Sequence, residues 1–122
     1  DKSKSSTIKP YVDKLDPMAR FEEKAWGSFT ILDIQPESLT IKIILRPGNE
    51  LKYHSHEHRD EVWTVLSGTG YAIVDDVRRE VKAGDVITLP VGCRHTIHAK
   101  SELQVIEVQI GAILDADDKI KY

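Results

Sequence analysis

The sequence predicts an all-β domain, and three features of the chain from residue 26 onward support this prediction. Short segments rich in β-branched and aromatic residues alternate with turns that contain Gly, Pro or Asp. The segments are about four to eight residues long, which is the usual length of a strand. No helical spacer separates them, which indicates an all-β rather than an α/β domain. The pattern is typical of a sandwich or barrel of about nine short strands.

Each expected strand is bounded by a recognisable turn. Pro36-Glu37-Ser38 separates the first two strands, and Pro47-Gly48 ends the second. Asp75-Asp76 and Ala83-Gly84-Asp85 flank a charged strand, and Pro90-Val91-Gly92 begins a loop. The expected strands are residues 28–34, 39–45, 54–56, 62–66, 71–74, 77–82, 86–89, 95–99 and 103–110.

The first 23 residues differ from the rest of the chain. Residues 1–10 are rich in Lys and Ser without periodicity and are expected to form a loose tail. Residues 10–23 carry apolar side chains among charges and are expected to form a short helix or an arm packed on the body, with Asp16-Pro17 able to start a helical turn. The predicted organisation is therefore a tail and arm at 1–23 and one β domain at 24–122.

Composition excludes several classes of protein. A chain of 122 residues is long enough for one domain with a single core. The net charge of −3 without a Lys/Arg cluster argues against a nucleic-acid partner. No apolar run exceeds four residues, which is far too short to span a bilayer, so no membrane partner is expected. Cys93 is the only cysteine and no signal-like segment is present, so a cytoplasmic location is expected.

Four residues are candidate metal ligands. His54 and His56 are two residues apart, so their imidazoles project from the same face of an extended strand. Glu61 stands at the start of the next strand, and a hairpin would bring its carboxylate back toward the imidazoles. Histidines and a carboxylate on one face are typical of a metal site. His95, which follows the Gly- and Pro-containing stretch 84–94, is the fourth candidate.

These residues stand in two motifs that resemble the signature motifs of the cupin superfamily. The first motif is complete at its fixed positions and reads Gly48-x5-His54-x-His56-x4-Glu61-x6-Gly68. The second is complete as far as its histidine and reads Gly84-x5-Pro90-x-Gly92-x2-His95, with Ala99 where an Asn is usual. The resemblance implies a double-stranded β-helix, a jelly-roll-like barrel, whose four inward ligands bind one divalent metal ion. Three imidazoles and one carboxylate suit Zn, Mn, Fe, Ni or Co.

The other histidines and the cysteine are expected outside this ligand set. His58 lies where the chain should already turn, and it is expected in a solvated loop, with a place in the lining of the site as the alternative. His98 has the opposite strand parity to His95 and is expected to face outward or to lie at the rim. Cys93 is expected to be a small buried thiol rather than a reactive one.

Further segments resemble one cupin branch, the domain of type II mannose-6-phosphate isomerases that occurs alone or fused behind a mannose-1-phosphate guanylyltransferase. The matching segments are Trp26-Gly27, Arg46-Pro47-Gly48, residues 58–63 and residues 106–111. This resemblance covers about residues 24–122 and implies an aldose–ketose isomerase that interconverts mannose 6-phosphate and fructose 6-phosphate. The sequence departs from the branch at His54, where Gln is common, and at Lys24-Ala25, where Arg-Pro is usual.

The resemblance and the strand parity together suggest further roles. Glu107, expected to point inward from the last strand, is the candidate base for moving a proton between C2 and C1 through an enediolate. An ion pair with Lys42 or Lys52 is the alternative interpretation of Glu107. Lys52, which has the parity of His54, is the second catalytic candidate. The candidate substrate-binding residues, which could receive a phosphate or a sugar hydroxyl, are Lys42, Arg46, Arg59 and Gln109.

Two other functions would use the same four ligands. One is a dioxygenase or oxidase that employs Fe or Mn, and the other is a non-catalytic module that binds a metal or a sugar. A small molecule, most simply a sugar phosphate, is the expected ligand. A homodimer is also expected, because cupins commonly pair through a sheet edge.

Overall fold

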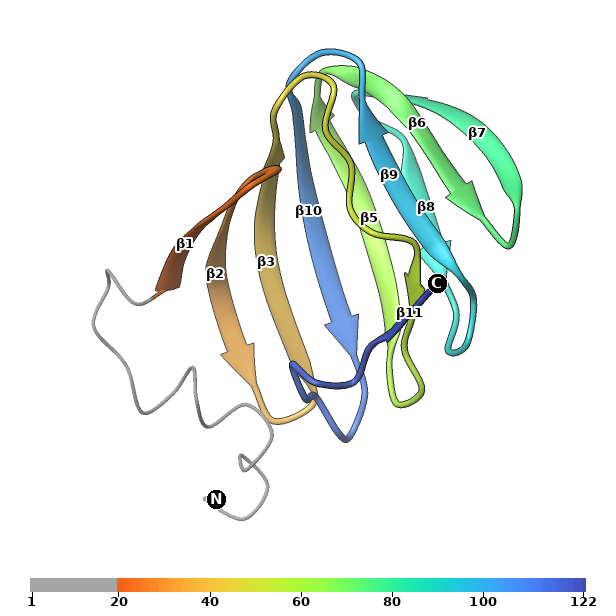
Figure 1. Ribbon diagram of the computed structural model, residues 1–122. Coiled ribbons are helices and arrows are strands. Elements are labelled where there is room, and N and C mark those ends of the chain that lie inside the picture. The colour runs from red at the N-terminus through yellow and green to blue at the C-terminus, as the bar shows by residue number, and fades with distance from the viewer. Residues whose placement is uncertain (1–19) are drawn as a thin grey trace.

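The computed structural model describes residues 20–122, which contain eleven strands in two antiparallel sheets (Figure 1). The six-stranded sheet has the order β1 (Phe21–Lys24), β2 (Gly27–Gln35), β3 (Ser38–Leu45), β10 (Leu103–Ile110), β5 (Asp60–Ser67) and β8 (Val86–Leu89). The five-stranded sheet has the order β11 (Ile120–Lys121), β4 (His54–Ser55), β9 (His95–Ala99), β6 (Thr69–Val74) and β7 (Val77–Lys82). The tail, the arm and the helical turn predicted at Asp16-Pro17 lie outside the described residues, apart from the last few residues of the arm.

Alternating side chains explain why the long strands bury one face. In β3 every second residue from Leu39 to Leu45 is buried, whereas Lys42 lies on the opposite, partly exposed face. Strand β10 alternates in the same way and pairs with β3 on one side and β5 on the other. Val105 thereby lies next to Ile43 and Val65, and all three are buried. The core lies between the two sheets, on the faces that these apolar residues share.

The predicted strands are confirmed, all within one or two residues of their expected limits. Two strands were not predicted. Strand β1 is exposed at all four positions, so it carries no alternation of buried residues, and it is held by its pairing with β2. Strand β11 has only two residues and pairs with β4, which is itself limited to His54–Ser55.

One motif glycine has a clear structural reason. Gly68 lies between β5 and β6 with φ of +90°, a backbone conformation that residues other than glycine rarely adopt. A Cβ atom there would lie 1.9 Å from the carbonyl oxygen of Glu102. The close approach of these two chain segments therefore requires glycine.

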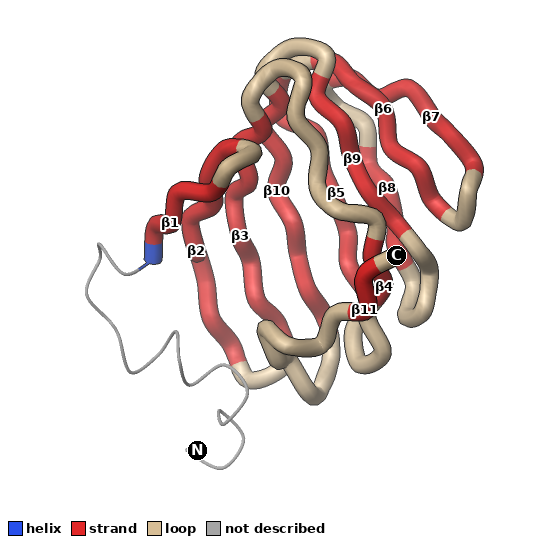
Figure 2. The backbone as a smooth tube through the Cα atoms, in the orientation of Figure 1, coloured by secondary structure: helices blue, strands red, loops and turns tan. Residues whose placement is uncertain are grey.

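The sheets do not close into a complete barrel, and the C-terminal segment runs across the open side. After β10 the chain turns back in front of the six-stranded sheet and ends at β11, next to β4 (Figure 2). Leu114 in this segment is buried against the core. Within residues 20–122 there is no helix with the length and apolar character that a membrane crossing requires.

Candidate metal centre

The four predicted ligands meet in one buried cluster. His54 lies on β4 and pairs directly with His95 on β9. Glu61 lies on β5, and His56 lies in the loop between β4 and β5. Their ligand atoms all lie within 4.8 Å of one another. Each side chain is at most 6% exposed, so the cluster is shielded from bulk water. The two sequence motifs thus bring their ligands to one point in space.

The three imidazoles are held in the same tautomer. The Nδ1 atoms of His54, His56 and His95 lie 2.5, 2.5 and 3.0 Å from the backbone carbonyl oxygens of Lys52, Asp118 and Cys93. A carbonyl oxygen can only accept a hydrogen bond, so each Nδ1 must donate. Each Nε2 then carries a lone pair, which is the form that binds a metal ion.

The charges of the cluster agree with this tautomer. Burial lowers the pKa of His54 to about 3, so its ring is neutral at physiological pH. Burial alone would raise the pKa of Glu61, but His56, His95 and Arg59 outweigh that effect and hold it well below its usual value. Glu61 is therefore an ionised carboxylate beside the neutral imidazole of His54, and both groups are in the charge state that binds a divalent cation.

Two polar atoms of the cluster favour a metal ion most directly. Oε1 of Glu61 and Nε2 of His95 are buried and have no hydrogen-bond partner among the described residues. They lie 3.4 Å apart. Buried polar atoms are nearly always paired, because leaving one unpaired costs about 1–3 kcal/mol. An ion bound between these two atoms would satisfy both, so the residues present fit a metal ion.

Arg59 fixes the other oxygen of the carboxylate. Its Nε donates to Oε2 of Glu61 at 2.8 Å, and a terminal nitrogen lies 3.3 Å from Nε2 of His56. The side chain is only 7% exposed, so this contact operates in a low-dielectric environment. Arg59 therefore orients Glu61 and leaves Oε1 directed at the cluster.

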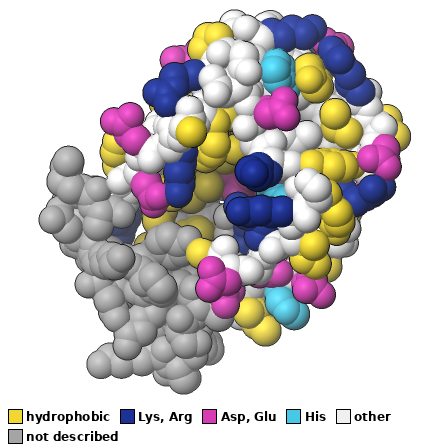
Figure 3. All heavy atoms as spheres, in the orientation of Figure 1, with side chains coloured by type: hydrophobic (Ala, Val, Ile, Leu, Met, Phe, Trp, Pro, Cys, Tyr) yellow, Lys and Arg dark blue, Asp and Glu magenta, His cyan; other side chains and the backbone are white. Residues whose placement is uncertain are grey.

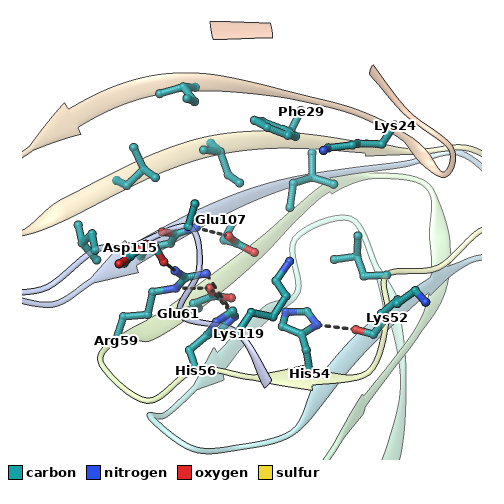
Figure 4. A pocket seen from close by; sticks show the side chains of 18 of the residues that line it. Lys24, Phe29, Lys52, His54, His56, Arg59, Glu61, Glu107, Asp115 and Lys119 are labelled. Atoms are coloured by element: carbon teal, nitrogen blue, oxygen red, sulfur yellow. Dashed lines mark hydrogen bonds and ion pairs between the residues drawn. The ribbon is translucent and has the colours of Figure 1, made fainter. Parts of the chain in front are cut away.

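A pocket of about 480 Å³ opens beside the cluster, between the six-stranded sheet and the C-terminal segment (Figure 4). His54, His56, Glu61 and Arg59 lie at its base. Its apolar wall is formed largely by β2 and β3, and it consists of Trp26, Phe29, Ile31, Leu39, Ile41, Ile43, Leu51, Leu114 and Ala116.

Glu107 lies in the wall of this pocket and is 6% exposed. Trp63 donates to its Oε1 at 2.7 Å and Gln109 donates to its Oε2 at 2.8 Å. Burial, with a contribution from the charge of Glu61, raises the pKa of Glu107 to about 7 despite these two donors. The inward orientation predicted for Glu107 is confirmed, and its hydrogen-bond partners are Trp63 and Gln109 rather than Lys42 or Lys52.

Lysine side chains gather at the mouth of the pocket. Lys24, Lys52, Lys119 and Lys121 all line it. Partial burial and the nearby Arg59 cation lower the pKa of Lys119. In Figure 3, Lys and Arg side chains lie beside a hollow in which hydrophobic atoms are visible. The pocket thus has lysines at its mouth, an apolar wall, and the ionised carboxylate of Glu61 at its base.

Two of the candidate substrate-binding residues, Lys42 and Arg46, do not line this pocket. Lys42 lies on the face of β3 opposite to Ile41 and Ile43, which line the pocket. Arg46 donates at 2.9 and 3.0 Å to the carbonyl oxygens of Lys24 and Ala25, so it braces the turn between β1 and β2. The alternation of β3 should have excluded Lys42 from the sequence alone.

The remaining candidates lie where the sequence placed them. Lys52, Arg59 and Gln109 line the pocket. His58 is exposed, and His98 faces outward, where it pairs with Glu50 at 3.1 Å. Cys93 is buried, and burial raises the pKa of its thiol to about 11, as expected for an unreactive cysteine. Lys119 and Lys121 also line the pocket, and the sequence did not predict this. The residues before them show no strand alternation from which the direction of their side chains could be inferred.

Comparison with known proteins agrees with this structure. The family described as Mannose-6-phosphate isomerase C-terminal matches residues 15–122. Mannose-1-phosphate guanylyltransferase 2 of Escherichia coli O157:H7 is 33% identical over 98% of the chain and 27% of its own length. The alginate biosynthesis protein AlgA of Pseudomonas aeruginosa is 30% identical over 96% of the chain and 26% of its own length. The chain therefore spans about a quarter of the length of these relatives.

Solved structures share the fold. An RmlC-like cupin from Shewanella frigidimarina superposes with a TM-score of 0.69 and 24% identity, over 75% of this chain and 83% of that chain. Oxalate decarboxylase from Bacillus subtilis gives a TM-score of 0.74 and 16% identity, over 83% of this chain and 29% of that chain. Both the match to the family and the fold agree with the two motifs and their buried ligand cluster. The chain is a cupin domain and belongs to the mannose-6-phosphate isomerase C-terminal family.

Proposed function

We propose that this protein is a metal-dependent isomerase that interconverts an aldose phosphate and its ketose, with mannose 6-phosphate and fructose 6-phosphate as the first pair to test. One observation carries the proposal. A buried cluster of three histidines and Glu61 shares a pocket with Glu107, a carboxyl group whose pKa is near 7. The family to which the chain belongs supports the choice of substrate.

The metal site would contribute charge. A divalent ion held by His54, His56, Glu61 and His95 would polarise neighbouring oxygen atoms of a bound sugar and offset the negative charge that develops on them. The identity of the ion is open among Zn, Mn, Fe, Ni and Co, which all accept imidazole and carboxylate ligands.

Glu107 is the group that we assign to proton transfer. Isomerisation moves one proton from C2 to C1, while a hydroxyl proton passes from O2 to O1. A carboxyl group with a pKa of about 7 is near half ionisation at neutral pH, so it can both accept the carbon-bound proton and return it. Trp63 and Gln109 hold its two oxygens and fix its direction.

The lysines at the mouth are the groups that we assign to the phosphate. Arg59 is already engaged by Glu61, His56 and the carbonyl oxygen of Asp115. Lys24 is paired with Glu22. Lys52, Lys119 and Lys121 are the pocket cations that have no ion pair among the described residues. Lys52 is exposed at this mouth, so we assign it to binding of the phosphate group rather than to proton transfer.

Turnover is the direct test of the proposed function. The metal-free chain, supplied in turn with Zn, Mn, Co, Ni and Fe(II), is expected to convert mannose 6-phosphate to fructose 6-phosphate with at least one of them. Conversion is measured by coupling the ketose to a reporter enzyme and by NMR of the sugar. Absence of turnover with every metal, in a protein that binds the metal, would exclude this isomerase activity and favour a non-catalytic binding module.

Replacement of Lys52 by methionine is expected to raise KM about fivefold and to leave kcat nearly unchanged. The lost group contacts the phosphate in both ground and transition states, and a partly exposed charge pair contributes about 1 kcal/mol. Steady-state kinetics separate the two constants. Lys42→Met is the matched control, because Lys42 faces away from the pocket. A fall in kcat at constant KM would instead place Lys52 in the proton transfer.

One observation favours a second candidate function. The apolar wall formed by β2 and β3 offers few partners for the hydroxyl groups of a sugar. A substrate with a polar end and an apolar body would fit this wall well. The reaction of such a substrate would be an oxidation that uses Fe or Mn held by the same four ligands. Oxygen uptake by the iron-loaded protein with small carboxylic or diketone substrates would support this candidate over the isomerase.

A further inference from the structure

The C-terminal segment, residues 111–122, contacts the metal-ligand cluster at several points. Its residue Asp118 makes the most contacts. The two carboxylate oxygens of Asp118 accept hydrogen bonds from the backbone N–H groups of Glu57 and His58, at 2.8 and 2.9 Å. The carbonyl oxygen of the same residue accepts the Nδ1–H of His56 at 2.5 Å. Asp118 thus joins the C-terminal segment to the loop that carries a ligand and to the ligand itself.

A second contact reaches Glu61 through Arg59. The guanidinium of Arg59 donates to the carbonyl oxygen of Asp115 at 3.2 Å and to Oε2 of Glu61 at 2.8 Å. In Figure 4 the guanidinium group lies between these two residues. The C-terminal segment therefore helps to hold the side chain that orients the carboxylate ligand.

A third contact reaches the strand of His54. Lys121 pairs with His54 in the short β11–β4 ladder, and the backbone N–H of Tyr122 donates to the carbonyl oxygen of Tyr53 at 2.9 Å. The hydroxyl groups of Tyr122 and Ser55 lie 2.8 Å apart. Three of the four ligands, all except His95, are thus held in part by the last residues of the chain.

We infer that Asp118 is a positioning residue of the metal centre, which fixes the C-terminal segment so that the carbonyl oxygen of Asp118 sets the tautomer and direction of His56. The inference rests on the metal site of the proposed function, but not on the isomerase reaction. Strand β4 has only two residues, so the loop that follows it has little regular pairing of its own. The carboxylate of Asp118 supplies the missing partners for two consecutive N–H groups of that loop.

The test is metal affinity in Asp118 variants of the full chain. Asp118→Asn keeps the shape of the side chain but has one oxygen in place of two, so it can accept a hydrogen bond well from only one of the two N–H groups. Asp118→Ala loses both of these hydrogen bonds. Loss of a partner that orients a metal-binding histidine typically weakens metal binding about 10- to 100-fold. We expect the weaker effect for Asp118→Asn and the stronger for Asp118→Ala, measured as the Kd of Zn or Mn by competition with a chromogenic chelator. Asp117→Asn is the matched control, since the side chain of Asp117 is exposed and the charge change is the same.

Hydrogen exchange provides a second readout that does not need the metal. In the wild type the amides of Glu57 and His58 are bonded to Asp118, and they are expected to exchange faster in both Asp118 variants but not in Asp117→Asn. A lower Tm with unchanged metal Kd would overturn the inference, because it would show a purely structural role. A wild-type protein that binds no divalent metal would overturn it together with the metal site, whereas tight binding without turnover would overturn only the isomerase.

Discussion

Replacement of His95 by alanine is expected to weaken binding of a divalent metal by at least about 100-fold. The change removes one of four ligand atoms, and even residues that only orient such ligands contribute about 10- to 100-fold. It also removes one of the two buried polar atoms that have no hydrogen-bond partner among the described residues, Nε2 of His95, which lies 3.4 Å from Oε1 of Glu61. The metal Kd is measured by chelator competition and the metal content of the purified protein by elemental analysis.

His98→Ala is the matched control for this experiment. The two histidines stand on the same strand three residues apart, but His98 faces outward and stacks on Tyr71 with ring centroids 4.7 Å apart. Its loss is expected to cost about 1 kcal/mol of unfolding free energy, from one aromatic contact and one ion pair, and to leave the metal Kd unchanged. Equal metal binding by His95→Ala and the wild type would mean that the cluster is not the metal site.

Strand periodicity accounts for what could be predicted from the sequence. The alternation in β3 and β10 is continuous over eight residues in each strand, so their limits and inward faces follow from side-chain hydrophobicity alone. The spacing of His54, His56, Glu61 and His95 is equally local, because each ligand occupies a fixed place in a strand or at its end. The same alternation, applied to Lys42, already predicts that this lysine faces away from the pocket.

The contributions of the C-terminal segment could not be predicted in this way. Asp118 contacts residues 60 or more positions earlier in the chain, and its segment has only two residues of strand and no periodic pattern. Arg46 is a related case, since a basic residue before a turn can face a pocket or brace a neighbouring turn, and only the pairing of β1 with β2 decides between them. Both roles depend on tertiary contacts between segments far apart in the sequence.

Replacement of Glu107 by glutamine is expected to reduce kcat for the isomerisation by about 100- to 10,000-fold, the usual contribution of a general base. Glutamine has nearly the same shape but cannot accept a proton. Its carbonyl oxygen can still accept the hydrogen bond from Trp63. Its new NH2 group meets the amide of Gln109, which must turn by about 180° so that its oxygen accepts instead of its nitrogen donating. Metal affinity should change little, because Glu107 is not one of the four clustered ligands. Single-turnover kinetics and chelator competition measure the two quantities separately.

The same variant has a second, independent signature in stability. The pKa of Glu107 is about 7 in the folded protein, above its ordinary value of 4.5, so the unfolded chain loses this proton at lower pH than the folded chain does. The stability contributed by the protonated group is therefore complete below about pH 4.5 and is lost as the pH rises toward 7. Over this range the loss amounts to about 3 kcal/mol, at about 1.4 kcal/mol for each unit of the shift from 4.5 to about 7.

Glutamine has no proton to lose, so the Glu107→Gln protein is expected to gain stability relative to the wild type as the pH increases from 4.5 to 7. Urea unfolding of the two metal-free proteins across this range measures the difference. A catalytic group is often kept in an environment that costs stability, and a variant that is more stable but inactive would fit that relation. A Glu107→Gln protein with wild-type turnover would exclude Glu107 as the base. A constant stability difference across the pH range would mean that the pKa of Glu107 is not raised by burial.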